Sequence, residues 1–342
     1  MTTIYLHIGT PKTGTTSIQN FLFNNRENIL KKGYLYPISG IISTAQNSKR
    51  SPQHLGLCEA LVKHYDIKSP VDTNSRDKCE RSWEELKREI ETINPKNVII
   101  SSEFFTAMQE YYNPDIIALV KKRLEDYETK IVLYVRRQDD FFRSSYCQYM
   151  TSPLPNKVPH HFQANYTHKN ILEISEFILS IKFQANYYST LELWKEAFGV
   201  NNIIVRPFEK EQMKNGSVVD DFLETINLNY EKSQLKLKSS RNISQSGKVI
   251  KIINLIEKIS QMRRLSKEKY WYLYTKIPFF RMDSRIKLAM FLSHLIPDFL
   301  MSEKLLSEED KANILKEFEE SNQKVAKEYL DRKNGRLFYS TQ

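Results

Sequence analysis

The residues best suited to chemistry stand in a short loop near the start of the chain. This loop, Gly9-Thr10-Pro11-Lys12-Thr13-Gly14-Thr15-Thr16, follows the apolar segment Thr3–Ile8 and precedes a helical pattern. Backbone amides in such a loop point at one spot, and the helix N-terminus adds positive partial charge. Together with the ammonium group of Lys12, they predict a site for a phosphate or a similar anion.

The spacing within this loop separates it from the nucleotide loop of common ATPases. That loop carries lysine directly after its second glycine, whereas Thr15 follows Gly14 here and Lys12 comes earlier. The sequence also offers no clear aspartate at a strand end to hold Mg²⁺. It therefore favours binding of a related phosphate ester over ATP hydrolysis.

A second group of polar residues follows the continuous apolar run Lys130–Val135. Arg136 ends this predicted strand, and Ser144 lies eight residues later in a predicted helix. A guanidinium group makes charge-assisted hydrogen bonds to phosphate, and a hydroxyl adds another donor. Arg137 with Ser145 has the same spacing, so the register of this pair stays open.

These two motifs resemble those of the sulfotransferases that use 3′-phosphoadenosine-5′-phosphosulfate (PAPS). The family's 5′-phosphosulfate loop is similar to Pro11, Lys12, Thr13, Gly14, Thr15 and Thr16. The family's 3′-phosphate ligands are similar to Arg136 and Ser144, although many members have proline where this chain has Gln138. The motif RRQD (residues 136–139), followed by Ser144, Tyr146 and Gln148, resembles the bacterial branch of this family.

The resemblance covers most of residues 3–245 and implies a fold and an activity. Ile203–Glu209 resembles a later strand, and Arg241-Asn242-Ile243-Ser244 resembles a loop that closes on the nucleotide, which implies Arg241 as a further cofactor ligand. The implied fold is a three-layer P-loop-like α/β sulfotransferase domain. The implied reaction moves a sulfuryl group from PAPS to a carbohydrate hydroxyl, on a polysaccharide or glycolipid, without a metal.

Such a reaction needs a group that stabilises the leaving oxygen and a base for the acceptor. Lys12 is the natural stabiliser of the leaving oxygen. Glu103 follows the predicted strand Asn97–Ser101, at the edge where open parallel sheets form their sites. His54, in the loop SPQHLGL, is a second candidate because a neutral imidazole suits a base near pH 7. The sequence leaves both candidates open.

The elements that carry these residues predict the fold class. Strands at Thr3–Ile8, Asn97–Ser101, Lys130–Val135 and Asn202–Arg206 alternate with helices, which indicates a mainly parallel sheet covered on both faces. Helices are expected at Thr15–Lys32, Trp83–Ile93, Pro114–Asp126, Asp139–Met150, Asn186–Phe198, Ser217–Ile226 and Leu305–Leu330. We expect a PAPS-binding domain over 1–245 and a helical extension over 246–342 packed on it.

Composition narrows the setting of the protein. The 342 residues carry a formal charge of +10, which predicts anionic partners, but no nucleic-acid module is recognisable. Three cysteines, Cys58, Cys79 and Cys147, lack metal-like spacing, and the histidines of the 151–170 loop have no matching carboxylates. Without a signal peptide or an apolar run of about 18–20 residues, we expect a cytoplasmic protein.

Two other functions remain open from the sequence. One is a P-loop nucleotide kinase or NTPase. The other is a non-catalytic protein that binds a nucleotide or a membrane surface. Basic and aromatic residues mingle in Arg263–Arg281, a composition that suits peripheral contact with an anionic membrane.

Overall fold

The computed structural model describes residues 1–41, 52–64, 81–106, 115–151, 172–229, 245–260, 282–297 and 300–340, with Tyr272, Lys276 and Ile277. The chain divides into two compact units. The sheet unit comprises Met1–Arg137, Asn186–Ser240 and Phe318–Gln342, and the helical unit comprises Gln138–Ala185 and Arg241–Glu317.

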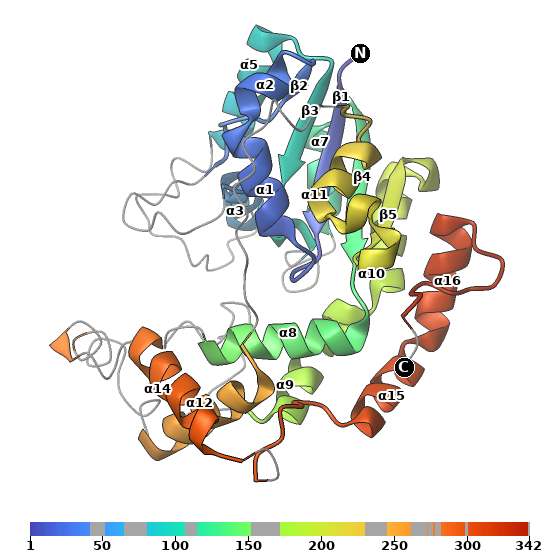
Figure 1. The fold of residues 1–342 in the computed structure, drawn as a ribbon. Helices are drawn as coiled ribbons and strands as arrows, with labels where there is room; N and C mark the ends of the chain where they lie inside the picture. Colours follow the sequence, from blue (N-terminus) through green and yellow to red (C-terminus); the bar gives the residue numbers. More distant parts are fainter. Residues whose placement is uncertain are drawn as a thin grey trace. The chain divides into compact units, whose positions relative to one another are not determined.

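A parallel five-stranded sheet forms the centre of the sheet unit, with β1 in the middle of the order β2-β3-β1-β4-β5 (Figure 1). The strands are β1 (Thr3–Gly9), β2 (Tyr34–Leu35), β3 (Asn97–Ser101), β4 (Glu128–Val135) and β5 (Ile203–Pro207). The predicted α/β class and parallel sheet are confirmed. Strand β2 has only two residues, too few for a periodic pattern to reveal it.

Helices cover both faces of this sheet because alternate strand residues point to opposite sides. Tyr5 of β1 packs with α1 (Thr15–Asn24) and α11 (Val218–Thr225), while Ile4 and Leu6 belong to the core on the other face. The helices of that second core are α3 (Leu55–His64), α5 (Ser82–Ile93), α7 (Asp115–Arg123), α10 (Tyr187–Phe198) and α16 (Glu319–Leu330). Figure 1 shows α1 and α11 in front of the strands.

Two of the predicted helices are each broken in the structure. The expected helix Thr15–Lys32 is α1 followed by α2 (Arg26–Leu30), and the side chain of Asn25 between them donates to the Phe21 carbonyl at 2.9 Å. Such local side-chain bonds compete with a continuous helix. The expected helix Leu305–Leu330 is α15 (Glu308–Glu317) followed by α16, with Phe318 between them.

The helical unit is built from α8 (Gln138–Thr151), α9 (Ile174–Ile181), α12 (Gly247–Ser260), α14 (Met282–Leu295) and α15. Inside it, the fully buried Arg285 of α14 donates to Glu257 of α12 at 3.1 Å. These units differ from the expected boundary at residue 245. Helix α8 packs with α12 and α15, and the last segment, 318–342, belongs to the sheet unit.

Short 3₁₀ helices complete the described parts. They are η2 (Lys182–Ala185), η3 (Val200–Asn202), η4 (Lys210–Gln212) and η5 (Lys214–Gly216). Ser217 caps α11, since its hydroxyl accepts from the amide of Asp220 at 3.3 Å. Ser307 caps α15 in the same way, accepting from the amide of Asp310 at 3.0 Å.

Candidate functional site

The carboxyl edge of the sheet, where β1 lies beside β4, carries several of the predicted site residues. The chain leaving β1 passes to β2 on one side of the sheet, and the chain leaving β4 goes on to β5 on the other side. Open α/β sheets bind ligands where the connections of neighbouring strands diverge in this way. The phosphate loop, residues 9–16, follows β1, and Arg136 follows β4.

The phosphate loop is tied to β4 by hydrogen bonds of its own residues. The amide and the hydroxyl of Thr10 both donate to the carbonyl of Tyr134, at 3.3 and 2.9 Å. Thr13 closes the turn, because its hydroxyl donates to the Thr10 carbonyl at 2.6 Å. These bonds hold the loop in place before any ligand binds, as preorganised anion sites require.

Gly14 allows the loop to enter α1. It has φ +79°, in the left-handed region, and a Cβ atom there would lie 2.9 Å from Val218 Cγ1 and 3.0 Å from the Phe208 ring. Only glycine fits both the backbone angle and the packing. The first turn of α1 contains no acidic side chain, so its positive partial charge is left for an anion.

Arg136 is bonded to the phosphate loop. Its Nη1 donates to the Lys12 carbonyl at 2.9 Å, and its guanidinium lies 5.5 Å from the centroid of the Phe208 ring. The neighbouring Arg137 instead donates to the carbonyl and hydroxyl of Ser340, at 3.2 and 3.1 Å. Of the two arginines, Arg136 is therefore the one bonded to the phosphate loop. This favours Arg136 over Arg137 as the predicted phosphate ligand.

Glu103 lies with Lys12 and Thr15 at the end of β3. The Thr15 hydroxyl and the Lys12 ammonium group are both close enough to the Glu103 carboxyl group to lower its pKa. Burial raises the pKa of Glu103, and the contributions of Thr15 and Lys12, which lower it, do not cancel that effect. The residue as a whole is partly exposed although protein surrounds its carboxyl group.

Gly9 brings the phosphate loop against this carboxylate. A Cβ atom on Gly9, which has φ +102°, would lie 3.1 Å from the Cα atom of Glu103. The loop after β1 and the end of β3 thus pack backbone to backbone. The structure thereby brings together Lys12, Thr15 and Glu103, which lie up to 91 positions apart in the sequence.

His54, the other predicted base, is completely buried and its ring is engaged by the backbone. The Ser101 amide donates to Nδ1 at 3.0 Å, so Nε2 carries the proton and donates to the Pro37 carbonyl at 3.0 Å. Burial lowers the pKa of His54 to about 4. Both ring nitrogens are already hydrogen-bonded to the backbone, so His54 has no role in the proposed reaction.

A buried polar group beneath the loop was not predicted. His7 of β1 contacts the Ser101 hydroxyl through Nδ1 at 2.8 Å, and Gln19 of α1 donates to the same hydroxyl at 3.1 Å. Burial lowers the pKa of His7 to about 3, so the ring is neutral. The signal available in the sequence was the single polar side chain inside the apolar run TIYLHI.

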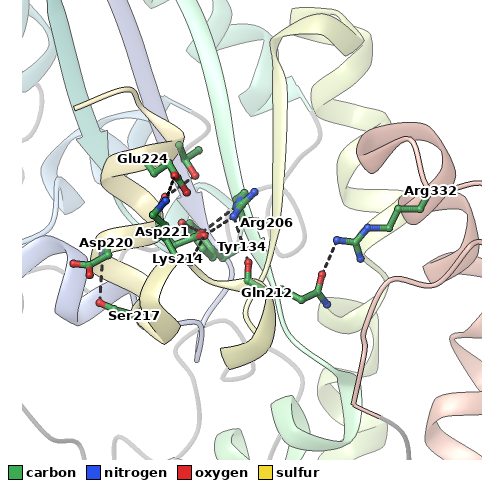
Figure 2. A network of polar contacts seen from close by, with 10 residues as sticks. Tyr134, Arg206, Gln212, Lys214, Ser217, Asp220, Asp221, Glu224 and Arg332 are labelled. Atoms are coloured by element: carbon green, nitrogen blue, oxygen red, sulfur yellow. Dashed lines mark hydrogen bonds and ion pairs between the residues drawn. The ribbon is translucent and has the colours of Figure 1, made fainter. Parts of the chain in front are cut away.

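A second unpredicted network supports the end of β4 (Figure 2). The buried carboxylate of Asp221, in α11, accepts from the Tyr134 hydroxyl at 2.7 Å and from Arg206 Nε of β5 at 3.0 Å. The Lys214 amide donates to the same carboxylate at 3.0 Å. Because the Tyr134 carbonyl holds Thr10, this network reaches the phosphate loop.

The remaining predicted ligands are placed as follows. Pro11 and Thr16 lie in the loop and the first turn of α1, partly exposed. Ser144 lies in α8, within the helical unit, so its pairing with Arg136 stays a prediction. Arg241 and the histidines His160, His161 and His168 lie outside the described residues.

The described ranges contain neither a cluster of metal ligands nor a helix that could span a membrane. No group of three or more His, Cys, Asp or Glu side chains in these ranges is arranged to hold a metal ion. None of the helices seen there combines the length and the apolar character required to cross a lipid bilayer.

Comparison with known proteins yields little about function. No protein-family model matches the chain, and no solved structure matches it. The chain is similar to an uncharacterized protein of Archaeoglobus fulgidus, with 26% identity over 238 residues. The match covers 69% of this chain and 55% of the archaeal protein, so the chain spans about half the length of that relative.

Proposed function

We propose that this protein is a PAPS-dependent sulfotransferase that transfers a sulfuryl group to a hydroxyl of a carbohydrate. The observation that carries the proposal is the meeting of Lys12, Thr15 and Glu103 at the ends of β1 and β3. An anion loop alone would fit many phosphate ligands. A carboxylate of raised pKa beside the loop lysine adds what an acceptor hydroxyl needs, namely a base close to the group being transferred.

The proposed roles follow from the position of each group. The amides of the phosphate loop and the start of α1, with Lys12, would hold the 5′-phosphosulfate. Arg136, already bonded to the loop, would hold the 3′-phosphate. The resemblance adds Ser144 and Arg241 to these ligands. PAPS, when bound, supplies the activated sulfuryl group.

The proposed sulfuryl transfer forms one bond to sulfur and breaks another, and it needs neither a metal nor an oxidant. The acceptor oxygen attacks sulfur in line while the bond from sulfur to the bridging phosphate oxygen breaks. The acceptor proton passes to Glu103, and the charge that develops on the leaving phosphate falls beside Lys12. As in phosphoryl transfer, positioning and electrostatics are expected to supply most of the rate.

The choice between this activity and a P-loop kinase rests on the lysine. In the kinase-type loop the lysine follows the second glycine and reaches the terminal phosphates of ATP. Here that position is Thr15, whose hydroxyl lies near the Glu103 carboxyl group. This arrangement supports a ligand with two phosphate ends rather than a triphosphate. The carbohydrate acceptor comes from the resemblance to the bacterial branch.

The test is a comparison of ligands by thermal unfolding. Adenosine 3′,5′-bisphosphate, the product of the proposed reaction, should raise the melting temperature, because a ligand at 100 times its dissociation constant stabilises by about 2.7 kcal/mol. ATP with Mg²⁺ should raise it less at the same concentration. A larger shift with Mg²⁺–ATP, and none with the bisphosphate, would favour the kinase instead.

We further propose that the helical unit contacts an anionic membrane surface. One side of α14 exposes Lys287, Leu288, Phe291 and Leu295, with Phe291 62% and Leu295 63% exposed. Residues 241–298 contain twelve Lys and Arg against four Asp and Glu. An exposed apolar stripe in a part of the sequence with this basic composition suits an interface with anionic lipid. The segment Arg263–Arg281, on which the sequence prediction rested, lies almost entirely outside the described residues.

A further inference from the structure

The C-terminal segment Leu337–Ser340, which we name the C-terminal clamp, is bonded to Arg137 and Glu209, which follow Arg136 and Phe208 in the chain. Arg137, next in the chain, donates to the carbonyl and hydroxyl of Ser340, at 3.2 and 3.1 Å. Phe208, whose ring lies 5.5 Å from the Arg136 guanidinium, is followed by Glu209. Glu209 is the residue on which the clamp is anchored.

The carboxylate of Glu209 is surrounded by donors from the clamp. The amides of Tyr339 and Ser340 both donate to it at 2.6 Å, and the Ser340 hydroxyl is a further donor. Burial raises the pKa of Glu209, but the bonds from Ser340, Tyr339 and Gln212 outweigh that effect and lower it. Glu209, only 9% exposed, is therefore an ionised acceptor at neutral pH.

A second set of bonds attaches the clamp at its other end. Gln212 donates to the Leu337 carbonyl at 3.0 Å and accepts from Arg332 at 2.6 Å. Figure 2 shows this contact between Arg332 and Gln212 beside the network of Arg206 and Tyr134. Arg332 also donates to the Leu337 carbonyl, at 2.9 Å. The clamp thus joins the ends of β4 and β5 from a segment more than 120 residues later in the sequence.

We infer that Glu209, Ser340 and Arg137 are positioning residues, which hold Arg136 in the geometry that binds the 3′-phosphate of the nucleotide. The inference rests on the proposed function. In this proposal, none of the three residues contacts the nucleotide. They fix the two backbone segments on either side of Arg136, and a guanidinium group binds phosphate strongly only when its donors are held in the required geometry.

The experiment compares two nucleotides that differ only in the 3′-phosphate. We would measure dissociation constants for adenosine 3′,5′-bisphosphate and adenosine 5′-monophosphate by calorimetry. The wild-type protein should prefer the bisphosphate. Glu209→Ala should weaken bisphosphate binding about tenfold, a loss typical of one impaired hydrogen bond to a charged group. Binding of the monophosphate should stay nearly unchanged, which general destabilisation would not produce.

A matched control removes a different carboxylate that also bonds the C-terminal part of the chain. Glu192 of α10 accepts from the Tyr329 hydroxyl of α16 at 3.0 Å. Glu192→Ala should leave the preference between the nucleotides intact. In an Arg136→Ala background, Glu209→Ala should have no further effect on that preference, because coupled residues are not additive.

The outcomes separate the two proposals. A wild-type protein that binds neither nucleotide, or shows no preference, overturns the proposed function. A wild-type preference that Glu209→Ala retains in full overturns the clamp alone. If Glu209→Ala does not fold, the ratio of the two dissociation constants is measured for Ser340→Ala instead. Ser340→Ala should lower the preference for the bisphosphate, and Ser340→Thr should restore it.

Discussion

Glu103 and His54 are both buried groups that could take a proton, yet their surroundings give them different capacities. The backbone occupies both ring nitrogens of His54, and its pKa is lowered to about 4. Glu103 has a raised pKa and lies beside Lys12 and Thr15. A carboxylate with a raised pKa is a stronger base, so burial here favours proton transfer to Glu103.

Glu103→Gln should lower kcat by about 10²–10⁴-fold, the usual contribution of a general base, with little change in bisphosphate affinity. The wild-type rate should fall as the pH drops through the pKa of Glu103, because only the ionised form accepts a proton. Since that pKa is raised, the fall should come at a higher pH than an ordinary glutamate would give. Steady-state kinetics from pH 4 to pH 9, roughly the range in which carboxylates and imidazoles titrate, would measure both effects.

His54→Gln provides the comparison for that variant. It should lower the melting temperature, because the bonds to Ser101 and Pro37 are disturbed, and should leave the pH profile in place. A fully active Glu103→Gln, together with an inactive but stably folded His54→Gln, would reverse the assignment of the base.

At the level of secondary-structure elements, the junction between the phosphate loop and α1 is fixed by contacts with neighbouring elements. Thr10 attaches the loop to β4, and Gly14 admits Val218 of α11 and Phe208 close to the start of α1. The loop is therefore shaped by contacts with β4 and α11, by the bond from Thr13 to Thr10 and by the backbone angle that Gly14 permits.

Gly14→Ala should lower the free energy of unfolding by more than the cost of a left-handed backbone alone, which is about 1–2 kcal/mol. The added Cβ atom must also displace Val218. Gly335→Ala is the comparison for the first cost, because Gly335 has φ +67° and a Cβ atom there meets only the flexible side chains of Gln323 and Lys327, at 3.3 Å. Urea unfolding of the two variants gives the difference, and equal losses would argue against the packing contribution.

At the scale of the whole molecule, the charge of +10 is unevenly distributed along the sequence. Residues 241–298 hold a large excess of Lys and Arg, and within the helical unit α14 exposes Phe291 and Leu295. Attraction to anionic lipid is worth about 1 kcal/mol for each basic residue near the surface and is screened by salt.

The protein should therefore sediment with vesicles that contain phosphatidylserine at low salt, and less so at high salt or with neutral vesicles. Phe291→Ser should weaken this binding. Leu179→Ser is the matched control, because Leu179 of α9 is 70% exposed in the same unit and lies outside the stripe. Equal binding of all three proteins would remove α14 from the interface, and no sedimentation under any condition would remove the membrane contact.

The sequence alone determines the fold class, because strands and helices alternate along it. Four of the five strands and the order of loop, lysine and arginine were readable from apolar runs and from local motifs. These features depend on residues close together in the chain. For the same reason, the position of Glu103 at the end of a parallel strand could be predicted to within a few residues.

Tertiary structure decided which of those residues meet. Only the packed sheet brings Glu103 to Lys12, closes the backbone around His54 and returns residues 337–340 to the ends of β4 and β5. It also assigns α8 to a different unit from β4. Such contacts join residues from 17 positions apart (Pro37 and His54) to 203 positions apart (Arg137 and Ser340). Local periodicity carries no information about them, because they depend on strand order and on side-chain packing.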